Sequence, residues 1–185
     1  MKFSRLIPFC FPALAYAHPQ GHAFGLLSGF AHPWLGTDHW LAMLAVGMLA
    51  ASQSGIKLQT GLIATFLASL VIGVYSPISI IPLSSIEYLI AVSVGVLGIA
   101  LASCRHLPPI SLIALIGVSG LLHGTAHGVE ISANSTMSSF IIGMVLASAL
   151  LHLGGFGLLK SSLPKIRIIS ASVLAASSAI LLWGL

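Results

Sequence analysis

Apolar runs of about 20 residues follow one another along almost the whole chain, and they constrain its fold more than any other feature. Charged residues make up only 5% of the 185 residues and the mean hydropathy is +1.09. A soluble domain could not cover so much apolar surface with so few charges. Only helices and closed barrels satisfy their backbone groups in lipid, and runs this long without strict alternation predict helices. We therefore expect an all-α integral membrane protein.

Clusters of Gly, Pro, Ser and Asn divide the apolar runs into six expected membrane spans. These spans cover residues 33–52, 58–76, 86–104, 110–128, 137–159 and 166–185. Together they predict a single six-helix transmembrane domain over residues 18–185. Three helices before the middle and three after it would have opposite orientations, which is the arrangement of an inverted repeat.

The first 17 residues resemble a signal peptide. Lys2 and Arg5 precede a short apolar stretch, and the sequence Ala-Tyr-Ala at 15–17 has the small-x-small pattern that signal peptidase cleaves. We expect the mature chain to begin at His18. The alternative is an uncleaved first helix, which the short length of the run disfavours.

The basic residues of the expected mature chain predict the orientation in the membrane. Because cleavage leaves the new N-terminus outside, the first, third and fifth loops should face the cytoplasm. These loops or their edges contain Lys57, Arg105, Lys160, Lys165 and Arg167. The positive-inside rule then predicts an N-out, C-out protein of the bacterial cytoplasmic membrane. This charge reports orientation and does not indicate nucleic acid, and Cys104, alone in the mature chain, cannot form an internal disulfide.

The segment "HPWLGTDH" begins the first expected span and is unusually polar. On a continuous helix His32 and His39 would lie two turns apart on one face, and Met43 continues that stripe. Asp38 would point away from it. It would need a neighbouring helix or a bend to join them, or it would orient a histidine from behind.

The position of Pro33 predicts where this first helix starts. Proline suits the first helical position and the residue before it resists helical geometry, so we expect His32 at the helix entrance. Residues 21–31 would then form an outer loop, a surface helix or a re-entrant segment.

A second polar cluster, "HGTAHGVE", occupies residues 123–130 near the outer end of the fourth span. His123, His127 and Glu130 have the spacing i, i+4, i+7 and share one helix face. Both clusters fall in the outer half of the bilayer. Other residues that could take part are Glu87, His152, Met43, His18 and His22, whereas His106 is expected in a solvated loop.

Imidazoles and carboxylates without a thiolate suit divalent ions such as Ni, Co, Zn, Cu(II) or Mn. Ionisable groups in the hydrocarbon region are costly, so two such clusters indicate a permeation route for a metal ion more than a set of hydrogen-bonded core histidines. Because ligands must be unprotonated, binding should weaken as pH falls through the range of histidine. The chain has no ATP-binding motif, so we expect a secondary permease.

Two alternatives to transport remain. One is a membrane metal- or haem-binding protein that stores, senses or transfers electrons, because histidines on facing helices can ligate haem iron. The other is catalysis, which we do not expect: residues 124 and 126 are Gly and Ala, so no glutamate general base lies between the histidines. No prosthetic group is expected.

The two motifs, at residues 32–50 and 123–130, resemble the signature segments of the HupE/UreJ family. The likeness extends over the whole chain and includes "IEYLIAVSVGVLG" and "LLHLGGFGLL". These bacterial membrane proteins are associated with hydrogenase or urease genes and are regarded as nickel, sometimes cobalt, permeases. The resemblance implies nickel as cargo and a functional link to nickel enzymes, and a homo-oligomer is left open. It implies a metal route through His32, Asp38, His39, His123, His127 and Glu130, with Glu87 and His152 at matching polar positions.

Overall fold

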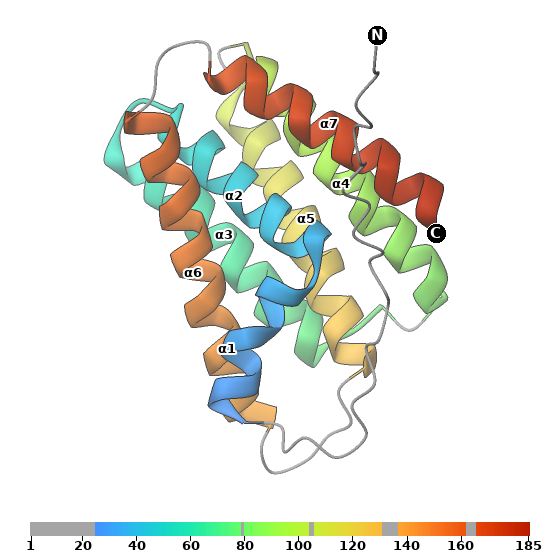
Figure 1. Ribbon diagram of the computed structural model, residues 1–185. Helices are drawn as coiled ribbons and strands as arrows, with labels where there is room; N and C mark the ends of the chain where they lie inside the picture. The colour runs from blue at the N-terminus through green and yellow to red at the C-terminus, as the bar shows by residue number, and fades with distance from the viewer. Residues whose placement is uncertain (1–24, 79, 104–105, 131–136, 162–165) are drawn as a thin grey trace, which may run out of the picture.

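The structure is a computed structural model that describes residues 25–78, 80–103, 106–130, 137–161 and 166–185, without the side chains of Glu130 and Ser161. The expected signal peptide lies outside these residues. The described residues fold entirely as α-helices and turns, which confirms the all-α prediction (Figure 1). The helices are α1 Leu26–Leu35, α2 Thr37–Ala51, α3 Ile56–Tyr75, α4 Leu83–Ser103, α5 Pro109–Glu130, α6 Met137–Ser161 and α7 Ile166–Gly184.

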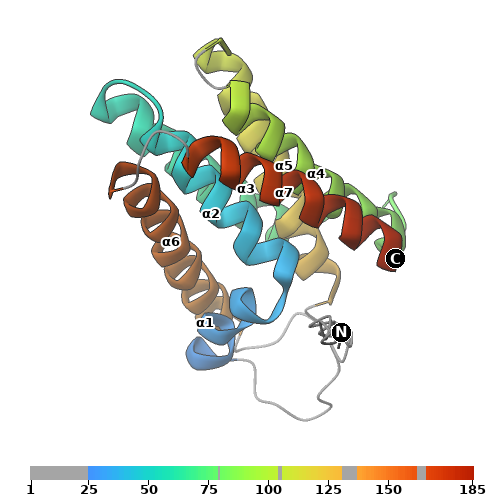
Figure 2. The same cartoon turned by 45° about the horizontal axis from the view of Figure 1, so that its top comes forward.

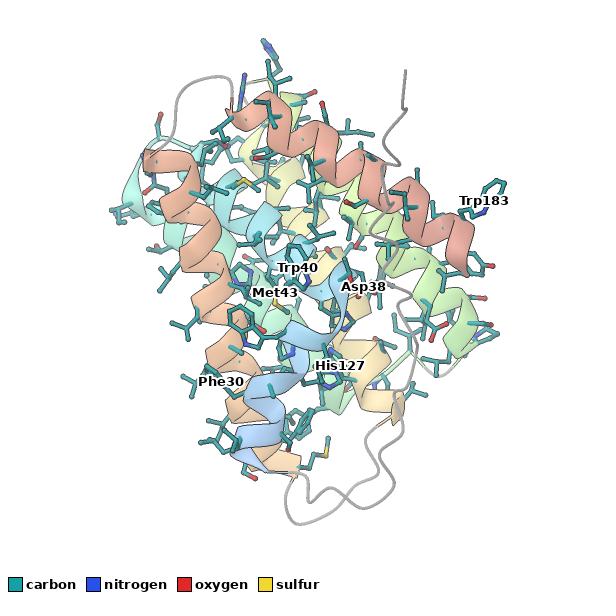
Figure 3. The ribbon with its side chains drawn as sticks, in the orientation of Figure 1. Phe30, Asp38, Trp40, Met43, His127 and Trp183 are labelled. Carbon is teal, nitrogen blue, oxygen red and sulfur yellow. The ribbon has the colours of Figure 1, made fainter. Side chains whose placement is uncertain are left out.

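Five helices, α3 to α7, are long and apolar enough to cross a membrane. Their ends agree with the last five expected spans to within three residues. Large apolar side chains such as Ile99, Leu153 and Trp183 are exposed on these helices, and Figure 3 shows Trp183 pointing away from the bundle. An exterior of this kind is stable in lipid, and the chain is a multi-pass membrane protein.

The prediction of one continuous first helix that starts at Pro33 is wrong. Pro33 lies inside α1, and the chain breaks after it at Gly36, where the backbone is extended (φ −95°, ψ 119°). The N-terminal part of α1 is held by α6, because a Cβ on Gly29 would overlap the carbonyl oxygen of Phe140. This close packing outweighs the local preference of proline for a helix start.

Helix α2 occupies the centre of the bundle. Ten of its fifteen residues are buried, and it packs against α6 on one side and against α4 and α7 on the other. Both views of the ribbon show this arrangement (Figures 1 and 2). The most extensive helix pairs are α3 with α5, α2 with α6, and α4 with α7.

Helices α2 and α6 touch through their backbones at two glycines. A Cβ added to Gly47 on α2 would overlap the carbonyl oxygen of His152 on α6. In return, a Cβ added to Gly155 on α6 would overlap the carbonyl oxygen of Leu44 on α2. Small residues allow this close approach, which is how helices commonly associate in lipid.

Helices α3 and α5 repeat the same pair of contacts. A Cβ on Gly124 of α5 would overlap the carbonyl oxygen of Leu70, and a Cβ on Gly73 of α3 would meet the carbonyl oxygen of Leu121 at 2.5 Å. Each α5 residue in these contacts follows its α2 counterpart by 77 residues, and each α6 residue follows its α3 counterpart by 82. The α2–α6 and α3–α5 pairs are therefore equivalent.

The third pair, α4 with α7, is related to itself by the same exchange. A Cβ on Gly98 would lie 3.0 Å from the carbonyl oxygen of Ala171, and 80 residues later Ser178 donates a 2.8 Å hydrogen bond to the carbonyl oxygen of Ala91. A pseudo-two-fold axis thus relates α2–α4 to α5–α7. Because α2 and α5 run in opposite directions in Figure 1, the two halves form an inverted repeat.

The glycine contacts predict a specific pattern of stability. Gly124→Ala places a methyl group against the Leu70 carbonyl and should lower the free energy of unfolding by about 1–3 kcal/mol, as overpacking does. Gly47→Ala should cost a similar amount because it is the equivalent position. Thermal unfolding of the purified protein in detergent measures the change.

Gly61→Ala is the matched control, because a Cβ at that helical glycine has nothing within 4 Å. It should leave stability unchanged or raise it by up to about 1 kcal/mol. Equal melting temperatures for Gly61→Ala and Gly124→Ala would contradict the packing of α3 on α5.

Candidate metal centre

The corner between α1 and α2 brings two histidines against α5. His32 lies in the last turn of α1 and His39 in the first turn of α2. Nε2 of His32 lies 3.1 Å from Nδ1 of His127, and Nε2 of His39 lies 3.1 Å from Nε2 of His127. We call these three residues the outer histidine cluster. One nitrogen of each ring can be chosen so that all three lie within 4.8 Å of one another.

Asp38 supports this cluster from behind His39. Its Oδ1 accepts a 2.7 Å hydrogen bond from Nδ1 of His39 and a 2.9 Å bond from the backbone N–H of the same residue. Figure 3 shows Asp38 and His127 close to the α1–α2 corner. A carboxylate in this position fixes the orientation of the ring and makes its other nitrogen a better ligand.

Gly36 makes room for this pair. A Cβ at Gly36 would lie 2.8 Å from Nδ1 of His39 and 3.0 Å from Oδ1 of Asp38. The glycine therefore serves two purposes, since it also ends α1 and allows the chain to turn into α2. The corner and the carboxylate–histidine pair depend on the same residue.

The hydrogen-bond partners assign the ring protons of the neutral imidazoles. The carboxylate of Asp38 only accepts, so Nδ1 of His39 carries a proton and its Nε2 holds a lone pair. His127 then donates from Nε2 to His39, and its Nδ1 accepts from Nε2 of His32. Protons thus point in one direction along the chain His32, His127, His39, Asp38.

A divalent transition ion fits this group of atoms. Three imidazoles with a carboxylate behind one of them form a donor set that suits Ni, Co or Zn. An ion bound between the rings would replace the two histidine–histidine hydrogen bonds, and His32 and His127 would each turn a lone pair to the ion. His127 is buried, whereas His32 and His39 are half-buried, so the cluster is reachable from one side.

Two more histidines lie deeper in the bundle. His123, one turn before His127 on α5, is fully buried and stacks edge-on against His39 with a ring separation of 5.2 Å. His152 on α6 is also fully buried. Both rings contact Phe66 of α3, at 5.7 Å and 4.9 Å between centroids.

The other residues singled out in the sequence lie elsewhere. Met43 is fully buried in the apolar core. Glu87 is exposed on α4, and no printed-length hydrogen bond or ring contact joins it to the histidines within the described residues. The side chain of Glu130, together with His18 and His22, lies outside what the structure describes.

The expected relation between His32 and His39 needs a correction. They do not share one face of a continuous helix, because Gly36 separates the two helices. They nevertheless meet at His127. The bend is also what lets Asp38 reach His39, so the arrangement corresponds to the predicted alternative of a bend with an orienting carboxylate.

The sequence gave no indication of the role of Phe66. It is one aromatic residue in an apolar run, with no polar neighbour in the sequence to distinguish it from core. Its contacts with His123 and His152 arise only when α3 packs against α5 and α6. A signal of this kind exists in three dimensions and not in local sequence.

The fold and the site define the class: a multi-pass membrane protein with a histidine cluster joining its two halves. The family of the HupE / UreJ protein matches residues 6–184. The chain is also 33% identical to Protein HupE of Rhizobium leguminosarum bv. viciae, over 100% of this chain and 97% of that protein. The chain belongs to the HupE/UreJ family. No solved structure matches it.

Asp38→Asn tests the orienting role of the carboxylate. Without its negative charge the hydrogen bond to His39 weakens, and affinity for Ni²⁺ should fall about 10–100-fold, the usual effect of removing such a support. Isothermal titration of the purified protein measures it. Thr37→Ala, at the adjacent position, is the control and should bind as wild type. Unchanged affinity in Asp38→Asn would contradict the assigned role.

Proposed function

We propose that this protein is a secondary permease that imports a divalent transition-metal ion across the cytoplasmic membrane. The observation that carries the proposal is the outer histidine cluster, whose ligand atoms lie within 4.8 Å. Its histidines come from both halves of an inverted repeat, which is where secondary transporters commonly place their substrate sites. Transport and not catalysis is the function these groups suit.

In the proposed topology α1 and α2 together make the sixth crossing. Their 10 and 15 residues give a combined helical length of roughly 37 Å, enough for a hydrocarbon core of about 30 Å. Broken helices are tolerated at membrane depth when the break is buried in protein or lines a cavity. The break at Gly36 lies beside the histidines and meets this condition.

The proposed orientation is N-out, C-out. Support comes from the three basic side chains of the described residues, Lys57, Lys160 and Arg167. They lie at the start of α3, the end of α6 and the start of α7, and these helix ends are at the same end of the bundle in Figure 1. That end faces the cytoplasm by the positive-inside rule, so the outer histidine cluster lies towards the periplasm.

The proposed cargo is Ni²⁺, with Co²⁺ as the second choice. The donor set alone admits several borderline divalent ions. Family membership and the relative named HupE favour nickel, and by the same resemblance the protein supplies nickel enzymes such as hydrogenase or urease. Passage requires a site firm enough to admit the ion and weak enough to release it, and half-exposed ligands suit this requirement.

The direct test is uptake of radioactive Ni²⁺ into proteoliposomes. His39→Ala removes the ligand that Asp38 orients, and its uptake rate should fall at least about tenfold, the loss expected for a metal-ligating group. His106→Ala, which changes an exposed histidine, should transport as wild type. Equal rates for wild type and His39→Ala would contradict the proposal. A Soret band in the purified protein would instead favour the haem-binding alternative.

Labelling of single cysteines tests the topology. In a variant without native cysteines, Ser76→Cys, in the turn after α3, should react in intact cells with a maleimide that cannot cross the membrane. Ser54→Cys, in the turn before α3, should react only after the membrane is opened. Both serines are exposed, so accessibility to solvent does not differ between them. The reverse pattern would contradict the N-out orientation.

A further inference from the structure

The two buried rings beside Phe66 have not been given a role in the proposed site. His123 lies one turn of α5 from the outer histidine cluster, towards the cytoplasmic end. His152 lies next to Gly47, because a Cβ on that glycine would overlap its carbonyl oxygen. Gly47 follows His39 by eight residues of α2, so it is roughly 12 Å deeper in the bundle.

The two rings lean towards a common depth. Nδ1 of His123 donates to the carbonyl oxygen of Ser119, and Nδ1 of His152 donates to that of Ser148, each four residues earlier on its own helix. Each ring therefore points back along its helix. Because α5 and α6 run in opposite directions, His123 leans inward and His152 leans outward (Figure 1). Both reach the ring of Phe66.

The same hydrogen bonds determine which nitrogen can bind an ion. A carbonyl oxygen only accepts, so Nδ1 carries the proton in each neutral ring and Nε2 holds a lone pair. Neither Nε2 has a hydrogen-bond partner in the described structure, although both are buried. A buried acceptor left without a partner is costly, and two of them on one aromatic ring indicate a missing ligand.

We infer that His123 and His152 form an inner binding site for a divalent transition-metal ion, beside Phe66 and below the outer histidine cluster. This inference rests on the proposed function for its cargo but not for its geometry. Both Nε2 atoms are set as ligands before the ion arrives. A site with two protein ligands binds more weakly than one with three, which suits the second step of passage.

The number of bound ions tests the inner site without relying on transport. Equilibrium dialysis of the purified full-length protein against saturating Ni²⁺ should give two ions per chain. His152→Leu, which keeps an apolar side chain of similar size, should bind one. Ser178→Ala, which removes a buried hydroxyl from the α4–α7 contact, is the matched control and should bind two. Where His152→Leu does not yield folded protein, His152→Gln replaces it, since its amide can still donate to Ser148.

Uptake by the same variants separates this inference from the proposed function. With an intact outer histidine cluster, His152→Leu should transport at least tenfold more slowly than wild type. If wild type binds two ions, the variant one, and neither transports, the inner site stands and the permease proposal fails. An unchanged number of ions in the folded His152 variants overturns the inner site, whatever their uptake.

Discussion

Backbone contact between helices at glycine is the constraint on which the rest of this structure depends. Lipid provides no hydrophobic drive for helices to associate, so close packing has to hold the bundle together. Gly47 and Gly155 bring α2 against α6, and Gly73 and Gly124 bring α3 against α5 in the same way. These contacts place α2 at the centre, where its outer end meets the histidines of α5.

The repeat in the backbone is not matched by a repeat in the ligands. The α2 residues equivalent to His123 and His127 are Val46 and Ala50, both fully buried and apolar. Histidines therefore line the outer half of the bundle, while the equivalent inner positions belong to the apolar core. An ion that leaves His152 meets this packed layer, which has to separate before the ion is released.

Much of this protein could be predicted from its sequence because lipid imposes strong rules on composition and length. Five spans and the depth of both histidine motifs follow from those rules. The α1–α2 corner could not be predicted, because helical periodicity assumes a continuous helix and the packing of Gly29 on α6 is a tertiary effect. The contact of Phe66 with two histidines also depends on helix packing, which no single apolar run specifies.

The central claim is that imidazoles from both halves of the repeat bind one divalent ion. X-ray absorption spectroscopy at the nickel edge tests it most directly, on purified full-length protein loaded with one equivalent of Ni²⁺. Nitrogen ligands with the multiple scattering of about three imidazoles are expected, and this signal should weaken in His127→Ala. A spectrum with only water-like oxygen ligands, or one unchanged by His127→Ala, would contradict the claim.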